Sequence, residues 1–183
     1  MSERPGALRT ARLDIVPGTI GHYEDELVDP GRLGRHLGAH VEPGWPPGEH
    51  DRGAVEFFMA RTRELGEAAA GWYAWYIVLR GVAGAPDALA GSIGYTGPPQ
   101  GDTAEIGYSV VESFRGRGIA TEAIVAMTER ALAVPGVTRV IAHTMEGNAP
   151  SQGALRRAGF RDVGPGTEPG MRRFERLPGG PAA

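Results

Sequence analysis

The chain has 183 residues, a formal net charge of −3 at pH 7 and 41% hydrophobic residues, which suits one well-cored globular domain. The small negative charge predicts no general attraction to nucleic acid or to an anionic membrane, and no apolar run approaches the roughly 20 residues of a membrane-spanning helix. Cysteine and lysine do not occur, so disulfides, a thiol nucleophile and cysteine metal sites are excluded. We therefore expect a cytoplasmic protein that has no nucleic acid, membrane or metal as a partner.

The N-terminal half predicts a strand followed by helices. Thr10–Val16 alternates polar and apolar side chains, as a half-buried strand does. Thr19–Leu27 and Gly31–Leu37 have apolar residues at helical spacing. A third helix is expected at Glu49–Leu65, after a proline-rich loop at Glu42–Gly48.

The second half of the chain predicts alternating strands and helices. Trp72–Leu79 (WYAWYIVL) is apolar on both faces of the pleat, which is typical of a central strand covered by helices on both sides. The best-defined element is a helix at Gly118–Ala133 with one apolar stripe. The other expected elements are strands at Ala88–Tyr95, Asp102–Val111 and Arg139–Thr144, a short helix at Pro150–Arg157, and a closing hairpin of Phe160–Val163 and Met171–Leu177.

This order of elements predicts the fold class α/β (α+β). We expect a single domain over residues 1–177, with a mixed, mostly antiparallel central sheet and helices on both faces. The C-terminal PGGPAA, residues 178–183, predicts a disordered tail.

A glycine-rich turn at Arg115–Ala120 (RGRGIA) leads from a strand into the best-defined helix. Glycine lets backbone N–H groups converge there, and a helix N-terminus adds partial positive charge, so the turn suits a pyrophosphate. A plain strand–helix turn that uses glycine for its shape is the alternative. No Gly-Lys-Ser/Thr follows the glycines, which excludes a nucleoside triphosphate P-loop.

The tract Glu105–Gly164 resembles the GCN5-related N-acetyltransferase (GNAT) superfamily. Arg115–Ala120 is similar to the acetyl-CoA pyrophosphate motif of that family, Arg/Gln-x-x-Gly-x-Gly/Ala. Asn148–Ser151, followed by Leu155–Phe160, is similar to the next family motif. The opening TARLDIV, the EIGY that begins at Glu105 and the N-x-x-S resemble the branch of ribosomal-protein N-terminal acetyltransferases, of the RimJ/RimL type.

The resemblance implies a GNAT-like domain that transfers an acetyl group from acetyl-CoA, its cosubstrate, to a primary amine by direct attack, without an acyl-enzyme. It also implies that a strand edge pairs with the pantetheine amides and that the glycine-rich turn faces the pyrophosphate. The cofactor-binding residues expected on this basis are Ser109, Val110, Val111, Arg115, Gly116, Arg117, Gly118, Ile119, Ala120, Thr121, Asn148 and Ser151.

Three residues of this tract are the candidates for catalysis. A protonated amine must lose a proton before or during attack, and Glu105, acting through a water molecule, is the candidate base. Many family members place a tyrosine as general acid where this chain has Leu155, so that role falls to Ser151 or to water. Asn148 binds the cofactor or holds a water near the thioester. The alternatives are a structural or exposed carboxylate for Glu105 and helix capping for Asn148 and Ser151.

Other residues have two interpretations each. Tyr108 lines the site or packs in the core, and His143 shuttles a proton or is an ordinary core or surface histidine. Trp45 lies on an acceptor-binding loop or anchors that loop by its burial. An acidic cluster draws in a cationic amine or forms a solvated helix face. Its members are Glu24, Asp25, Glu26 and Asp29.

Two function classes stay open on the sequence. The first is an acetyl-CoA-dependent N-acetyltransferase. The second is a non-catalytic acyl-CoA-binding or interaction domain that has kept the cofactor turn and lost the chemistry. The sequence does not specify the acceptor, because a protein N-terminus, an aminoglycoside-like amine and a small-metabolite amine are all compatible with it. A homodimer is also left open.

Overall fold

The computed structural model describes residues 4–179, apart from the side chains of residues 67 and 68. Two short 3₁₀ helices, η1 (Gly66–Ala69) and η2 (Glu112–Phe114), connect longer elements. The helices are α1 (Ile20–Val28), α2 (Pro30–Leu37), α3 (Arg52–Leu65), α4 (Ile119–Leu132) and α5 (Ala149–Arg157). The strands are β1 (Leu8–Arg9), β2 (Leu13–Pro17), β3 (His40–Val41), β4 (Ala74–Leu79), β5 (Ala88–Tyr95), β6 (Thr103–Val110), β7 (Arg139–Met145), β8 (Arg161–Pro165) and β9 (Met171–Arg176).

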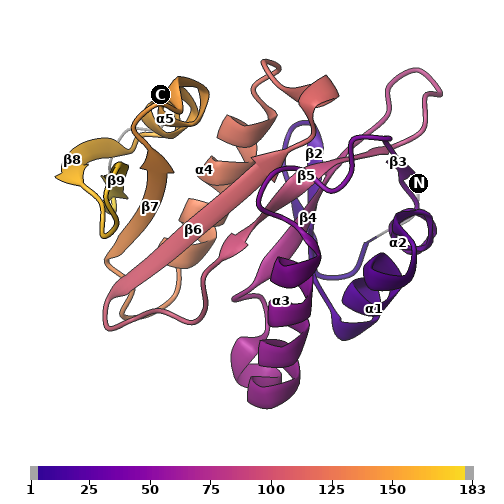
Figure 1. Cartoon of the computed structure of the whole chain (residues 1–183), viewed down its shortest axis with the longest axis horizontal. Helices are drawn as coiled ribbons and strands as arrows, with labels where there is room; N and C mark the ends of the chain where they lie inside the picture. Colours follow the sequence, from indigo (N-terminus) through magenta and orange to yellow (C-terminus); the bar gives the residue numbers. More distant parts are fainter. Residues whose placement is uncertain (1–3, 180–183) are drawn as a thin grey trace.

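The strands form one sheet in the order β1-β2-β4-β5-β6-β7-β9-β8, with β3 beside β5. Neighbouring strands are antiparallel, except that β6 pairs with β7 and β3 pairs with β5 in parallel. In Figure 1, α3 lies in front of the sheet and α4 lies behind it. The expected α/β class, with a mixed and mostly antiparallel sheet covered on both faces, is confirmed.

The sheet opens between β6 and β7. These two strands are paired only where Thr103–Glu105 faces Arg139–Ile141. Beyond that point β6 stays on β5 as far as Val110, while β7 stays on β9 as far as Met145. The two strands therefore diverge, as Figure 1 shows, and the end of β6 leads through η2 into α4 beside the opening.

The core lies between the sheet and the helices on each face. The apolar stripe expected on the best-defined helix runs through Ile119, Ala120, Ala123, Ile124, Met127 and Ala131, and it is confirmed because α4 buries all of these except Ala120. The expected central strand is β4, and its residues from Ala74 to Val78 are all buried.

The expected strand Thr10–Val16 is wrong in its first part. The chain turns at residues 10–12 to form the β1–β2 hairpin, in which the Thr10 N–H donates to the Leu13 carbonyl at 3.0 Å. Arg80, which follows β4, donates to the carbonyls of Thr10 and Ala11. These contacts hold the backbone in a turn, whereas a straight strand would direct the two carbonyls apart.

Three smaller differences between the expected and the observed elements remain. The third helix begins at Arg52 rather than at Glu49, because the Asp51 side chain accepts from the Ala54 N–H and so caps the helix there. The short strand β3 was not expected. Of the expected tail, residues 178 and 179 form a turn, and residues 180–183 lie outside the described part of the chain.

Candidate active site

The glycine-rich turn lies between η2 and α4, beside the opening of the sheet. Gly116 and Gly118 have φ angles of 74° and 75°, in the left-handed region that favours glycine. Gly118 caps α4 without a side-chain hydrogen bond, and within residues 4–179 the amides of residues 116–121 have no hydrogen-bond acceptor. Free N–H groups at a helix N-terminus fit the oxygen atoms of a diphosphate.

Two exposed arginines, Arg115 and Arg117, belong to this turn. The Arg115 Nε donates to the Val110 carbonyl at 3.0 Å, which folds the side chain back toward the end of β6. The guanidinium carbon of Arg117 lies 5.5 Å from the centre of the Phe114 ring, within cation–π range. Both side chains thus have a contact that holds their charge near the turn.

The end of β6 forms the strand edge expected to pair with pantetheine. Ser109 is in register with Ser92 of β5, and the Val111 N–H donates to the Ala90 carbonyl at 2.9 Å. In an antiparallel ladder alternate residues direct their backbone groups to the neighbouring strand, so Val110 directs its own toward the opening. Its carbonyl already accepts from an arginine of the turn. The Val110 N–H is therefore the group suited to a pantetheine carbonyl.

Glu105 lies on β6 at the last position that pairs with β7, opposite Ile141. Its Oε1 is 2.8 Å from Nδ1 of His143, two residues further along β7. With the proton on Nδ1, His143 donates to Glu105. Its Nε2, which is buried and has no partner in the described residues, then carries a lone pair and no proton, so no N–H donor is left unpaired there. The second carboxylate oxygen of Glu105 stays available, since the side chain is 33% exposed.

Tyr108 and Ser151 meet across the gap between β6 and α5. The Tyr108 hydroxyl is 2.8 Å from the Ser151 Oγ and donates to the Ser151 carbonyl at 3.1 Å. Burial raises the pKa of Tyr108, and the hydrogen bond to Ser151 opposes part of that rise. The phenol therefore stays protonated at neutral pH, and the two hydroxyl groups form a donor pair beside the opening.

The expected helix cap is also present at α5. Oδ1 of Asn148 accepts from the Ser151 N–H at 3.2 Å, so Asn148 is the N-cap residue. Leu155, where many family members have a tyrosine, is fully buried and has no group to offer a thiolate. Tyr108 supplies a phenol from a different element, β6.

A cavity of about 140 Å³ lies on the face of β5 and β6 that carries Glu105. Its floor consists of small residues from both strands, and α3 and the loop before α3 form its wall. The lining residues that matter here are Ser92, Gly94, Gly107, Ser109, His50 and Phe58. Because side chains alternate along a strand, Glu105 is on the same face as Gly107, at the next position of that face.

The acidic side chains of the α1 cluster form hydrogen bonds and ion pairs with other residues of the fold. Glu26 is buried, and its carboxylate accepts from Trp45 Nε1 at 2.8 Å and from the Tyr76 hydroxyl at 2.7 Å, with His50 Nε2 at 3.1 Å. The solvated-face interpretation is therefore wrong for Glu26. The anchor interpretation of Trp45 is confirmed by the same contacts. Of the others, Glu24 pairs with Arg63, Asp25 with Arg32 and His36, and Asp29 caps α2.

An opened sheet, free amides at a helix N-terminus and a carboxylate beside a cavity define a class of protein that binds an anionic cofactor next to a second substrate. The model of the acetyltransferase (GNAT) domain family matches residues 33–161, and the chain belongs to this family. The expectation of an acetyl-CoA-dependent N-acetyltransferase is thereby confirmed, and the acceptor is left unspecified.

Solved structures of acetyltransferases have the same fold. The microcin C7 self-immunity acetyltransferase MccE, in complex with acetyl-CoA and AMP, matches with a TM-score of 0.63 and 17% identity over 94% of this chain and 97% of that one. A GNAT-family acetyltransferase from Bacillus anthracis matches with a TM-score of 0.62 and 19% identity over 93% and 98%.

RimL, a ribosomal alpha-N-protein acetyltransferase in complex with coenzyme A, matches with a TM-score of 0.62 and 18% identity over 92% of this chain and 95% of that one. At this level of identity the likeness shows a shared fold. No curated protein sequence shows a significant match to the chain.

Within residues 4–179, no helix is long and apolar enough to cross a membrane, and no group of three or more acidic or histidine side chains is placed to hold a metal ion.

The sequence pattern does not predict two pairings in the site, Glu105 with His143 and Tyr108 with Ser151. The signal for the first pair was weak: both residues lie on predicted neighbouring strands, but their register was unknown. For the second pair, alternation along β6 places Tyr108 on the face opposite Glu105, toward the later helices.

Proposed function

We propose that this chain acetylates a primary amine with Glu105 as the base, Ser151 as the donor to the leaving sulfur and the turn at residues 115–121 as the diphosphate site. The observation that carries the proposal is the position of Glu105. It stands where β6 and β7 separate, with one carboxylate oxygen held by His143 and the other available. The glycine-rich turn follows the end of β6 beside this opening, and Gly107 and Ser109 of β6 line the cavity.

The residues of the turn fit the diphosphate of coenzyme A. The unpaired amides of residues 116–121 supply donors, and the positive end of the α4 dipole favours an anion by about 0.3–1 kcal/mol. Arg115 and Arg117 add positive charge beside them. The Val110 N–H and Asn148, with the Ser109 and Val111 positions beside them, would hold the pantetheine arm.

When bound, acetyl-CoA supplies the thioester carbonyl and a thiolate leaving group. The acceptor enters the cavity from the α3 side, and Glu105 takes a proton from its ammonium group, directly or through a water molecule. The free amine then attacks, and the amide nitrogen loses its second proton to solvent. Ser151 donates to the departing sulfur, and the Tyr108 hydroxyl, by turning its one proton from the Ser151 carbonyl to the Ser151 Oγ, orients that hydroxyl and replaces its proton.

The cavity supports a small amine head group in the acceptor. Its volume of about 140 Å³ and its floor of serine and glycine leave room for one short side chain or an aliphatic amine, while the rest of the acceptor stays outside. A peptide N-terminus, an aminoglycoside-like amine and a small metabolite all present such a group, so the acceptor class is tested by assay.

From the order of elements we also propose that residues 1–177 form a single catalytic domain. From composition and charge we propose that the protein is cytoplasmic and has no nucleic acid partner. A homodimer stays a prediction, which sedimentation of the purified chain tests.

A thiol-release assay tests the function. Acetyl-CoA is incubated with the protein and with peptides, aminoglycosides and small amines in parallel, and free coenzyme A is measured. We expect turnover with one amine class and none without an acceptor. Coenzyme A binding by calorimetry with no turnover on any amine would favour the alternative, a non-catalytic acyl-CoA-binding domain.

A further inference from the structure

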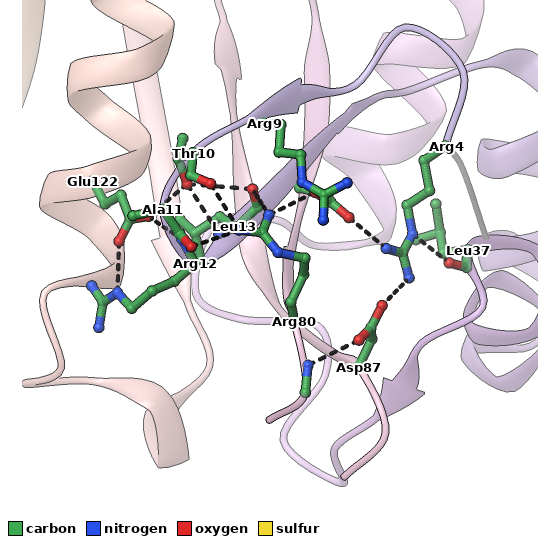
Figure 2. Close-up of polar contacts among 12 residues, drawn as sticks. Arg4, Arg9, Thr10, Ala11, Arg12, Leu13, Leu37, Arg80, Asp87 and Glu122 are labelled. Atoms are coloured by element: carbon green, nitrogen blue, oxygen red, sulfur yellow. Dashed lines mark hydrogen bonds and ion pairs between the residues drawn. The ribbon is translucent and has the colours of Figure 1, made fainter. Parts of the chain in front are cut away.

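The turn between β1 and β2 is joined to the first turn of α4 through one carboxylate. Glu122 Oε1 accepts from the Thr10 hydroxyl at 2.5 Å and from the Arg12 N–H at 2.8 Å, and its Oε2 accepts from Arg12 Nε at 2.7 Å. Figure 2 shows these contacts converging on Glu122. The carboxylate is thus held by three donors that lie more than 100 positions away in the sequence.

The same hairpin turn is anchored to the sheet on its other side. Arg80 donates to the carbonyls of Thr10, Ala11 and Leu13 at 2.6–2.7 Å and to Asp14 at 2.7 Å. Figure 2 shows Arg80 among these acceptors. Because the turn is bound to both β4 and α4, it is a fixed point of the fold beside the glycine-rich turn.

Arg12 extends from this fixed point to the glycine-rich turn itself. Its Nη1 donates to the Arg117 carbonyl at 2.8 Å. The Arg117–Gly118 peptide is trans, and in a planar trans peptide the C=O and the N–H point in opposite directions. When Arg12 holds the carbonyl on its own side, the Gly118 N–H is directed to the other side, where it has no acceptor among the described residues.

The pairing of Glu122 with Arg12 also neutralises a negative charge next to the glycine-rich turn. Glu122 is in the first turn of α4, where an unpaired carboxylate would repel a diphosphate. Burial acts to raise the pKa of Glu122, but the hydrogen bonds from Thr10 and Arg12 and the Arg12 charge outweigh it, so the pKa lies below its ordinary value. The ionised group therefore faces Arg12 and not an incoming anion.

We propose that Arg12 is a positioning residue for the diphosphate site: fixed by Glu122, it holds the Arg117 carbonyl and so directs the Gly118 N–H toward the bound phosphates. This inference rests on the proposed function, because it needs coenzyme A in that site. It assigns a role in cofactor binding to the N-terminal hairpin, which lies outside the glycine-rich motif.

Calorimetry of coenzyme A binding tests the role of Arg12. We expect Arg12→Ala to bind about tenfold more weakly than the unsubstituted protein, the factor that about 1.4 kcal/mol produces. Arg9→Ala is the matched control, since it removes an arginine of the same hairpin whose side chain is 55% exposed and whose one ion pair among residues 4–179 is a 3.8 Å contact with Asp14. Its affinity is expected to be unchanged.

A comparison of two acyl donors separates positioning from general damage to the fold. In Arg12→Ala the KM for acetyl-CoA should rise about tenfold with kcat nearly unchanged, while the KM for S-acetylpantetheine, which has no diphosphate, should stay the same. An equal rise for both donors would show a structural effect alone and would overturn the inference.

Two further variants distinguish geometry from charge. Arg12→Lys keeps the positive charge but replaces the planar guanidinium, whose Nε and Nη1 contact Glu122 and the Arg117 carbonyl, by one ammonium on a flexible stem; it does not reproduce both contacts in the same geometry, and we expect weak binding again. Glu122→Gln should weaken binding as well, and adding Arg12→Ala to it should produce no further loss, because the two residues act as a unit.

The results of these experiments distinguish a failure of the Arg12 inference from a failure of the proposed function. Full affinity in Arg12→Lys would overturn the positioning role and assign the effect to charge. Normal coenzyme A binding by every Arg12 variant would overturn the inference and leave the proposed function intact. No binding by the unsubstituted protein would overturn both.

Discussion

Glu105 on β6 and His143 on β7 are joined by a 2.8 Å contact between Oε1 and Nδ1, at the point where their strands separate. The two strands hold the backbones of both residues in place, and the hydrogen bond selects one rotamer of the Glu105 side chain. One oxygen is therefore occupied, and the other stays available on a side chain that is 33% exposed. This relationship explains how a partly exposed glutamate can be held in one orientation for proton transfer.

The first prediction concerns Glu105. Glu105→Gln should lower kcat by about 10²–10⁴-fold, the range for loss of a general base, and should leave the affinity for coenzyme A nearly unchanged. Steady-state rates over a range of pH, together with calorimetry, measure both quantities. Glu56→Gln is the control, because Glu56 is on the exposed face of α3 in an ion pair with Arg52. A Glu105→Gln protein with unchanged kcat at every pH would exclude Glu105 as the base.

The second prediction concerns the hydroxyl pair. Ser151→Ala should lower kcat about tenfold, since a thiolate leaves readily even with a weak donor, and Tyr108→Phe should lower it less. The double variant should be no slower than Ser151→Ala, because Tyr108 acts through Ser151. Tyr73→Phe serves as the control, since Tyr73 contacts Arg61 on α3. Losses that multiply in the double variant would mean that the two hydroxyl groups act separately.

The third prediction concerns the floor of the cavity. A Cβ at Gly107 would meet no atom within 4 Å, so a larger side chain there would extend into open space without clashing. We expect the series Gly107→Ala, Gly107→Val and Gly107→Leu to raise the KM for the amine in that order, about tenfold or more at the last step. The KM for acetyl-CoA and the melting temperature should change little. An amine KM that is the same in all three variants would place the acceptor elsewhere.

The fourth prediction concerns acid stability. The pKa of Glu122 is lower in the folded protein than its ordinary value of 4.5, so its ionised form stabilises the fold at higher pH. That stabilisation is complete above the unfolded pKa and is lost as the pH falls through the folded one. Glu122→Gln should therefore reduce the free energy of unfolding at pH 7 by about 1 kcal/mol, a value discounted for solvent screening.

Denaturant titrations at several pH values measure this effect. The difference in stability between the unsubstituted protein and Glu122→Gln should shrink below pH 4.5 and disappear in stronger acid. A difference that stays constant down to the acid transition would mean that the contacts of Glu122 do not depend on its charge.

Much of the fold follows from local sequence patterns. The α4 stripe, the buried strand β4 and the glycine-rich turn before α4 could all be predicted, since each depends on residues close together in the chain. The start of β2 could not be predicted in this way. Alternation continues through Thr10–Val16, but the turn at residues 10–12 depends on Arg80, which arrives from the end of β4.

The acidic cluster shows the same limit at the level of side chains. Glu24, Asp25 and Glu26 follow one another on α1, and their charge alone suggests that they are solvated. Glu26 is buried all the same, because Trp45 and Tyr76 bring donors to it from a loop and from β4. Burial of a carboxylate depends on partners that the local sequence does not contain.

By itself the sequence determined the order of the main helices and strands and the glycine turn at the start of α4, because backbone preferences and helical periodicity are set by near neighbours. Its motifs from Glu105 to Gly164 also carried the resemblance to the family. Only the tertiary structure decided which side chains act together: Glu105 with His143, Tyr108 with Ser151, and Arg12 with Glu122. The physical reason is that a hydrogen bond requires atoms within about 3 Å, and contact at that range between distant segments follows from strand register and helix packing.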